Sequence, residues 1–156
     1  MTTIAWDGKT LAADSQSTSG SMISSLRERK IYHPPIPTAW KLNGQDVRAI
    51  GVSGDCGSEL VLIDCLKEGM TYKAEMPEVY GFTAMVITDD RQCYLIFKSE
   101  GKKQATVCLQ PNQYAIGSGN EIARTAMALG KTAQEAVQVA CELDVYSGGD
   151  VVTFTI

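Results

Sequence analysis

The sequence predicts an α+β domain in which antiparallel sheets are covered by helices on their outer faces. Along the 156 residues, strand patterns come first, followed by one helix, further strands, two helices and a final strand. Short turn signals such as Asp7-Gly8 separate neighbouring strands, as is usual for antiparallel pairs. No repeat, low-complexity tract or linker interrupts this order, so residues 1–156 are expected to form one domain.

The first half of the chain is predicted to contain four strand segments and one helix. The strand patterns cover residues 2–6, 10–13, 30–32 and 47–52. Residues 15–25 are small and polar, which predicts a loop or a weak strand, and residues 34–37 form a proline-rich loop. After a turn at residues 53–57, the spacing of Leu60, Ile63 and Leu66 predicts a helix that ends at Gly69.

The second half is predicted to contain five strands and two helices. The strand patterns cover residues 82–88, 93–97, 105–109, 114–116 and 151–156, with turns at residues 89–90 and 100–101. Ser118 and Thr132 are each followed three residues later by a glutamate, which is the pattern of a capping box at the start of a helix. Gly130 marks the boundary between these two alanine-rich helices.

The charge pattern argues against nucleic acid or an anionic membrane as the main partner. The net charge is −4, and the basic cluster at residues 27–30 is interrupted by Glu28. No apolar run approaches the roughly 20 residues of a membrane span, and the N-terminus lacks the pattern of a signal peptide. We therefore expect a cytoplasmic protein.

The cysteines and the single histidine do not suggest a metal site or a disulfide framework. There are five scattered cysteines, without a CxxC pair: Cys56, Cys65, Cys93, Cys108 and Cys141. They are expected to be buried, reduced thiols, and no metal or organic cofactor is expected. The only histidine, His33, stands in the proline-rich loop, which argues against a Ser-His-Asp or Cys-His enzyme.

The start of the chain offers a nucleophile of another kind. An initiator Met1 followed by a small residue is normally removed, and this would leave Thr2 as the N-terminal residue. Such a threonine has both a hydroxyl nucleophile and a free α-amine, whose pKa of roughly 7.7–8.0 suits a general base near neutral pH. Thr3 would need a second cleavage to become terminal, so Thr2 is preferred. A nearby lysine would lower the pKa of the amine, and an acid would hold that lysine.

Six short segments along the chain supply candidates for these roles. In order, they are Thr2-Thr3-Ile4-Ala5, Ala12-Ala13-Asp14-Ser15, Lys30-Ile31, Gly51-Val52-Ser53-Gly54, Gly117-Ser118-Gly119 and Asp144-Val145-Tyr146-Ser147-Gly148-Gly149. Together they resemble the β-type subunits of proteasomes and the bacterial HslV peptidase. The last segment is similar to the proteasomal D-x-Y-S-G-G signature and is the most specific of the six.

The resemblance implies a four-layer αββα sandwich of the N-terminal nucleophile (Ntn) hydrolase type, with two antiparallel sheets between helical layers. It also implies a threonine endopeptidase that acts on peptides or unfolded proteins in a homo-oligomeric ring, with an ATP-dependent unfoldase as a candidate partner. The implied roles fall on eight residues: Thr2 as nucleophile, Lys30 tuning its amine, Asp14 holding Lys30, Ser118, Asp144 and Ser147 orienting the amine, Gly54 stabilising the oxyanion and Val52 lining the substrate pocket.

Departures from the family pattern leave two other interpretations open. The first hairpin is short, and residues 70–80 leave little room for a second helix after the Gly54 region, as in a minimal bacterial or bacteriophage member. If Met1 is retained, the amine is acylated, and the protein would be a catalytically silent ring or scaffold. An Ntn amidase acting on a small amide is the third possibility. Ser118 also has a purely structural interpretation, as the N-cap of its helix.

Overall fold

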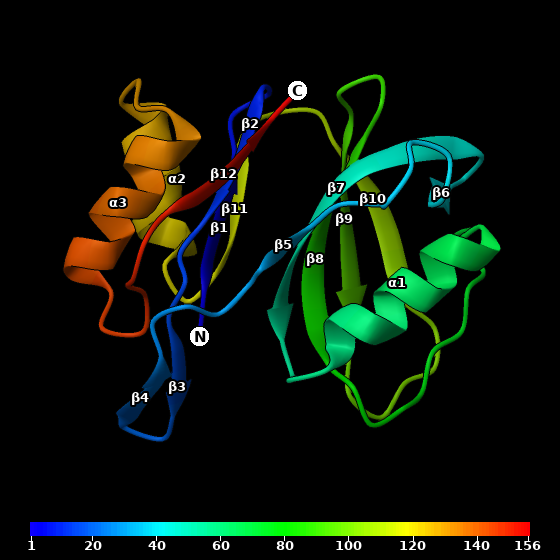
Figure 1. The fold of residues 1–156 in the computed structure, drawn as a ribbon, viewed down its shortest axis with the longest axis horizontal. Coiled ribbons are helices and arrows are strands. Elements are labelled where there is room, and N and C mark those ends of the chain that lie inside the picture. The colour runs from blue at the N-terminus through cyan, green and yellow to red at the C-terminus, as the bar shows by residue number, and fades with distance from the viewer. The chain divides into compact units, whose positions relative to one another are not determined.

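Twelve strands and three helices make up the computed structural model, which describes residues 1–156 and has the predicted α+β class (Figure 1). The chain divides into two units. The first contains residues 1–31 and 112–156, and the second contains residues 32–111. The predicted strands lie within two residues of observed ones at each end.

The first unit is built on a four-stranded antiparallel sheet in the order β11-β1-β2-β12. Its strands are β1 (Thr3–Trp6), β2 (Thr10–Ala13), β11 (Tyr114–Gly117) and β12 (Val152–Thr155). The turn between β1 and β2 follows from Asp7, whose carboxylate accepts the backbone N–H groups of Lys9 and Thr10. Strand β1 is buried along its whole length, as expected for a central strand.

Helices α2 (Asn120–Ala128) and α3 (Ala133–Leu143) cover one face of this sheet (Figure 1). Their contact with the sheet is made largely of alanines, and such small side chains allow close approach of helix and strand. The buried residues of this core are Ala5, Ala12, Ala115, Ala123, Ala126, Met127, Ala133, Ala136 and Val137.

The two predicted capping boxes have different outcomes. Thr132 caps α3, because its hydroxyl accepts a hydrogen bond from the backbone N–H of Glu135. The prediction for Ser118 is wrong: α2 begins after Gly119, and no side chain caps it. The hydroxyl of Ser118 is engaged elsewhere, as described below.

A short hairpin formed by β3 (Ser17–Ser19) and β4 (Met22–Ser25) occupies the segment predicted as a loop or weak strand. Its register shifts between Ser17 and Thr18. Met22 and Ile23 are exposed on it, so the apolar periodicity that normally identifies a strand is missing.

The second unit contains a six-stranded sheet in the order β10-β9-β8-β7-β5, with β6 paired to β7, and β6 to β10 pair antiparallel. Its strands are β5 (Ile31–Tyr32), β6 (Lys41–Leu42), β7 (Gln45–Gly54), β8 (Phe82–Thr88), β9 (Cys93–Lys98) and β10 (Thr106–Gln110). Helix α1 (Ser58–Glu68) packs on this sheet and ends at Gly69 in a left-handed conformation, as predicted. The two-residue strand β6 had no sequence signal.

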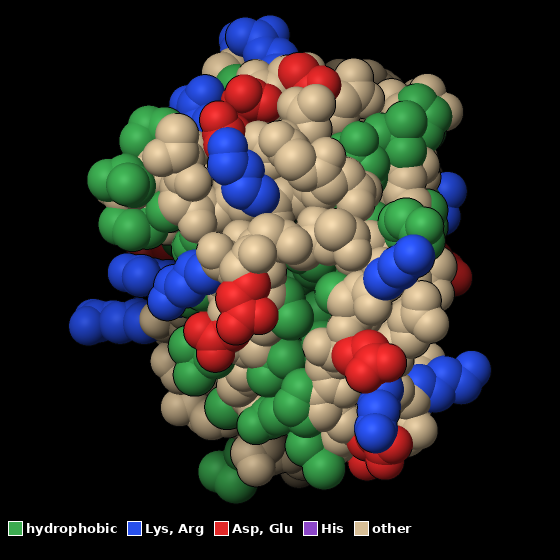
Figure 2. Space-filling model, turned by 90° about the vertical axis from the view of Figure 1, so that its right-hand side faces the viewer, with side chains coloured by type: hydrophobic (Ala, Val, Ile, Leu, Met, Phe, Trp, Pro, Cys, Tyr) green, Lys and Arg blue, Asp and Glu red, His purple; other side chains and the backbone are tan.

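The cysteines differ in part from the expectation. All five are free, but Cys56 and Cys108 are exposed, whereas Cys93 is buried. None of the three helices has the length and apolar character needed to span a bilayer. On the face of the molecule drawn in Figure 2, acidic and basic side chains lie among hydrophobic ones, without a continuous patch of one charge.

Substitution of Gly117 tests how tightly the N-terminus packs against β11. Gly117 and Gly130 both have φ +93, but a Cβ on Gly117 would lie 2.0 Å from the Thr2 carbonyl oxygen, whereas Gly130 has open space within 4 Å. We expect Gly130→Ala to lower the free energy of unfolding by about 1 kcal/mol, the cost of a left-handed alanine. Gly117→Ala should lower it by roughly 3 kcal/mol or more, because the backbone must also move. Urea unfolding of both variants measures the difference, and equal losses would contradict the close packing.

Candidate active site

The pairing of β1 with β11 places the start of the chain beside the turn that leads into α2. Thr3 lies opposite Gly117 in the sheet, and the backbone N–H of Thr2 donates to the Ser118 hydroxyl at 3.2 Å. Thr2 is buried, with 6% of its surface exposed. Residues 2 and 118 are thus brought together by strand register, although 116 positions separate them.

Asp14, which follows β2, accepts hydrogen bonds from four donors. Its Oδ1 accepts the N–H of Thr3 at 2.9 Å and the ammonium of Lys30 at 2.8 Å. Its Oδ2 accepts the N–H groups of Gln16 at 3.3 Å and of Gly148 at 3.1 Å. An ionised carboxylate has about four acceptor positions, so Asp14 is fully satisfied although it is buried.

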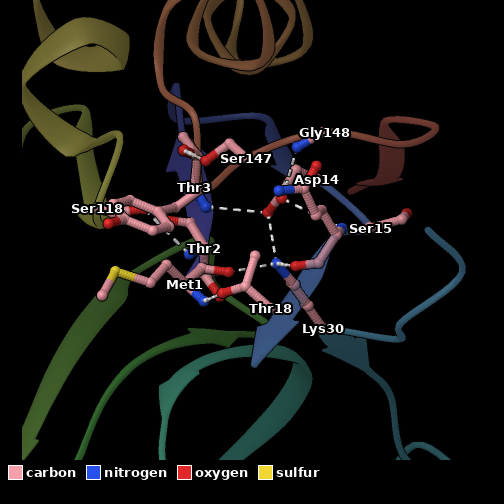
Figure 3. Close-up of polar contacts among 12 residues, drawn as sticks. Met1, Thr2, Thr3, Asp14, Ser15, Thr18, Lys30, Ser118, Ser147 and Gly148 are labelled. Atoms are coloured by element: carbon pink, nitrogen blue, oxygen red, sulfur yellow. Dashed lines mark hydrogen bonds and ion pairs between the residues drawn. The ribbon is translucent and has the colours of Figure 1, made fainter. Parts of the chain in front are cut away.

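The Lys30 ammonium uses all three of its donors inside the protein (Figure 3). Besides Asp14, it donates to the carbonyl oxygens of Gln16 at 2.6 Å and of Met1 at 2.9 Å. Burial lowers the pKa of Lys30 from its usual value, and the hydrogen bond and charge of Asp14 oppose that shift. A buried cation therefore lies next to the carbonyl that precedes Thr2.

A second cluster lies on the other side of the N-terminus. The Oδ2 atom of Asp144 accepts the hydroxyl of Ser118 at 2.7 Å and the hydroxyl of Ser147 at 2.6 Å. Asp144 follows α3 directly, and the backbone N–H of Tyr146 donates to its Oδ1 at 3.2 Å. Burial alone would raise the pKa of Asp144, but hydrogen bonds from Ser147, Ser118 and Tyr146 outweigh it and lower the pKa below its usual value.

Met1 is present and has a defined position. Its side chain is exposed, its amine lies 3.4 Å from the Thr18 hydroxyl, and its carbonyl is held by Lys30. In this form the Thr2 nitrogen is an amide, which cannot act as a base. Removal of Met1 would leave a free amine beside Ser118 and would free one donor of Lys30.

The structure therefore brings together six of the eight predicted site residues in the first unit: Thr2, Asp14, Lys30, Ser118, Asp144 and Ser147. Val52 and Gly54 belong to the second unit, where both lie on β7 opposite β8. Gly54 has φ +146, and a Cβ there would lie 2.5 Å from the Gly81 carbonyl oxygen, so this position requires glycine. Their roles toward Thr2 remain predictions.

Two residues of the site, Thr3 and Gln16, had no assigned role in the sequence. Thr3 donates its N–H to Asp14 and its hydroxyl contacts Ser147 at 2.6 Å. The backbone carbonyl of Gln16 accepts a hydrogen bond from Lys30. Its side chain lies close to Gly148, so that a Cβ on this glycine would be only 2.3 Å from the Gln16 Oε1 atom. A backbone carbonyl carries no side-chain signal, so only the Gly148-Gly149 pair hinted at such crowding.

The Cys141 thiol is not a nucleophile at neutral pH. Burial, supported by the charge of Asp14, raises the pKa of the Cys141 thiol to about 11, so the thiol is protonated at neutral pH. His33 is exposed in the second unit. No group of three or more His, Cys, Asp or Glu side chains converges in a way that could hold a metal ion.

Comparison with solved structures identifies similar folds. BPH from Thiobacillus denitrificans in complex with epoxomicin matches with a TM-score of 0.65 and 17% identity, over 99% of this chain and 97% of that one. BPH from the same organism, in a second structure, matches with a TM-score of 0.61 and 19% identity, over 99% of this chain and 96% of that one. At these identities the likeness shows that the chain shares its overall fold with BPH. No protein-family model and no curated protein matches the chain.

The Asp14–Lys30 pair is predicted to be the main ionic contribution to stability at this site. Its side chains are 0% and 5% exposed, and Asp14→Ala would leave the ammonium buried without a counter-charge. We expect a loss of about 3–5 kcal/mol in the free energy of unfolding. Lys131→Ala is the matched control: its ion pair with Glu135 is 57% and 47% exposed, and its loss should cost less than about 0.5 kcal/mol. Similar losses in the two variants would argue against a stabilising role for the buried pair.

Proposed function

We propose that this protein is a threonine-type endopeptidase of the proteasome-like Ntn hydrolase class, with Thr2 as its nucleophile after removal of Met1. The observation that carries the proposal is the convergence of two hydrogen-bond networks on the N-terminal residues. The Ser118 hydroxyl accepts a hydrogen bond from the backbone N–H of Thr2, and the Lys30 ammonium donates one to the carbonyl that precedes Thr2. The fold shared with BPH, which binds epoxomicin, supports the same conclusion.

In the proposed reaction, the Thr2 hydroxyl attacks the peptide carbonyl while its own α-amine takes the hydroxyl proton. The resulting tetrahedral intermediate collapses to an ester of Thr2, and the protonated amine gives its proton to the departing peptide nitrogen. A water molecule, deprotonated by the same amine, then hydrolyses the ester. The chain's own residues therefore provide both the nucleophile and the base.

Lys30 and Asp14 are proposed to set the electrostatics of this step. The Lys30 ammonium repels a positive charge on the terminal amine, which lowers the pKa of the amine toward neutral pH. Once Met1 is gone, the donor that now holds the Met1 carbonyl at 2.9 Å becomes available to the Thr2 hydroxyl. Asp14 keeps Lys30 charged and in place through their 2.8 Å contact.

Ser118, with Asp144 and Ser147 behind it, is proposed to orient the amine. The amine would donate one hydrogen to Ser118, as the Thr2 amide does now, and direct its lone pair to the Thr2 hydroxyl. The backbone N–H of Gly54 is proposed to stabilise the oxyanion, and Val52 to line a moderately apolar pocket for the residue before the cut.

The proposal includes an architecture and an assembly. The two units are proposed to form a single Ntn-hydrolase domain, with their sheets stacked as the inner layers of a four-layer αββα sandwich. We propose a cytoplasmic, HslV-like homo-oligomeric ring of a minimal bacterial or bacteriophage type, which receives peptides or unfolded proteins and has an ATP-dependent unfoldase as a candidate partner. The absence of a helix between α1 and β8 accords with a minimal member.

Substitution of Thr2 tests the nucleophile. Thr2→Ala removes the hydroxyl and should lower kcat for a fluorogenic peptide by at least about 10³-fold, whereas Thr2→Ser should retain measurable turnover. Thr153→Ala on the exposed face of β12 is the control and should be indistinguishable from wild type. Hydrolysis that persists in Thr2→Ala would refute the mechanism.

Intact mass before and after incubation with epoxomicin separates the active and blocked forms. The proposal predicts a chain without Met1 that gains one inhibitor molecule, and no adduct on Thr2→Ala. A chain that retains Met1 and gains no adduct would instead indicate a catalytically silent ring or scaffold. A reactive chain that cleaves small amides but no peptides would indicate an Ntn amidase.

A further inference from the structure

A buried hydroxyl next to the proposed nucleophile, that of Thr3, has no role in the proposed reaction. Thr3 is fully buried, with 0% of its surface exposed, and its Oγ1 lies 2.6 Å from the Ser147 hydroxyl. Its backbone N–H is separately fixed by Asp14. Thr3 is therefore held at two points, one in each of the networks that meet at the N-terminus.

Counting protons fixes the direction of these hydrogen bonds. Asp144 has a lowered pKa, so it is ionised near neutral pH and can only accept. Ser147 has one hydroxyl hydrogen, and the short contact to the Asp144 carboxylate uses it. Toward Thr3, Ser147 can then offer only a lone pair, so the Thr3 hydroxyl must be the donor.

Ser118 likewise has a single hydroxyl hydrogen to donate. The Ser118 hydroxyl lies 2.7 Å from Asp144 and 3.2 Å from the Thr2 carbonyl oxygen. The shorter, charge-assisted bond takes its single hydrogen, and its lone pair accepts the Thr2 N–H. Asp144 thus reaches Thr2 through Ser118 and Thr3 through Ser147.

We propose that the hydroxyl of Thr3 is a positioning group for the catalytic amine of Thr2, acting through Ser147 and Asp144. This role rests on the proposed function. By donating to Ser147, Thr3 keeps the hydrogen of that hydroxyl on Asp144, and so helps to fix the carboxylate that orients Ser118 beside the Thr2 nitrogen. It also strengthens the Ser147–Asp144 bond, which spreads the negative charge of Asp144 away from the amine.

The space around Thr3 suits a test by substitution. A Cβ on Gly119 would lie 2.0 Å from the Thr3 hydroxyl oxygen, so the side chain packs directly against the Gly119 backbone. Thr3→Val replaces the hydroxyl with a methyl group of nearly the same size and removes its capacity to hydrogen-bond. Thr3→Ser keeps the donor and removes a methyl group.

The experiment measures kcat, KM and the pH dependence of kcat/KM on a fluorogenic peptide, with the loss of Met1 checked by mass. We expect Thr3→Val to lower kcat by roughly 10-fold or more with little change in KM, because the base is misplaced. Without the Thr3 hydroxyl, more of the negative charge of Asp144 should act on the Thr2 amine and raise the pKa of that amine. The acidic limb of the pH profile should therefore move to higher pH. Thr3→Ser should restore both kcat and the pH profile.

Wild-type kcat and pH profile in Thr3→Val would overturn the role, as would equal losses in Thr3→Val and Thr3→Ser. If Thr3→Val does not fold, Thr3→Ala compared with Thr3→Ser gives the same contrast, because this pair also differs only by the hydroxyl. Thr2→Ala in the same assay separates the two proposals. If Thr2→Ala remains active, both the proposed function and the role of Thr3 are overturned. If Thr2→Ala is inactive but Thr3→Val has wild-type kinetics, only the role of Thr3 is overturned.

Discussion

The buried carboxylate of Asp14 is the interaction on which the rest of the site depends. It accepts hydrogen bonds from Thr3 in the first strand, from Gln16 between β2 and β3, from Gly148 in the last loop, and from the Lys30 ammonium. An ion in the interior is tolerated only when its charge and its lone pairs are all satisfied, and here they are. The same four bonds that make the charge tolerable fix the N-terminus relative to the lysine.

Asp144 is also a carboxylate that accepts several hydrogen bonds, but its role differs from that of Asp14. It is half-buried, its acceptors face two serine hydroxyls, and it contacts the N-terminal residues only through them. Asp14 thus fixes the backbone and the cation, whereas Asp144 fixes the direction of hydroxyl protons. Glycines allow both networks to close, because a side chain at Gly117, Gly119 or Gly148 would overlap Thr2, Thr3 or Gln16.

Much of the fold could be predicted from local pattern. The hairpin at Asp7, the helix ending at Gly69 and the cap at Thr132 follow from side chains that bond to their own nearby backbone. Predictions failed where a distant partner competes for the same group. Ser118 has the sequence of a helix cap, but its hydroxyl binds Thr2 and Asp144, and α2 starts without a side-chain cap. The hairpin β3–β4 carries exposed apolar side chains, so its strands lack the expected alternation.

The amino-acid types and their local patterns give the groups available for chemistry: a threonine at position 2, an acid at the end of a strand, one lysine in a basic cluster, and a serine- and glycine-rich final loop. Which of these groups meet depends on how the chain folds. The pairing of β1 with β11 places residue 2 beside residue 118, and the fold of the first unit places residue 14 beside residues 30 and 148. The role of Thr3 is the clearest case. Hydrogen-bond direction depends on which neighbours have already used their protons, and a linear sequence does not contain that information.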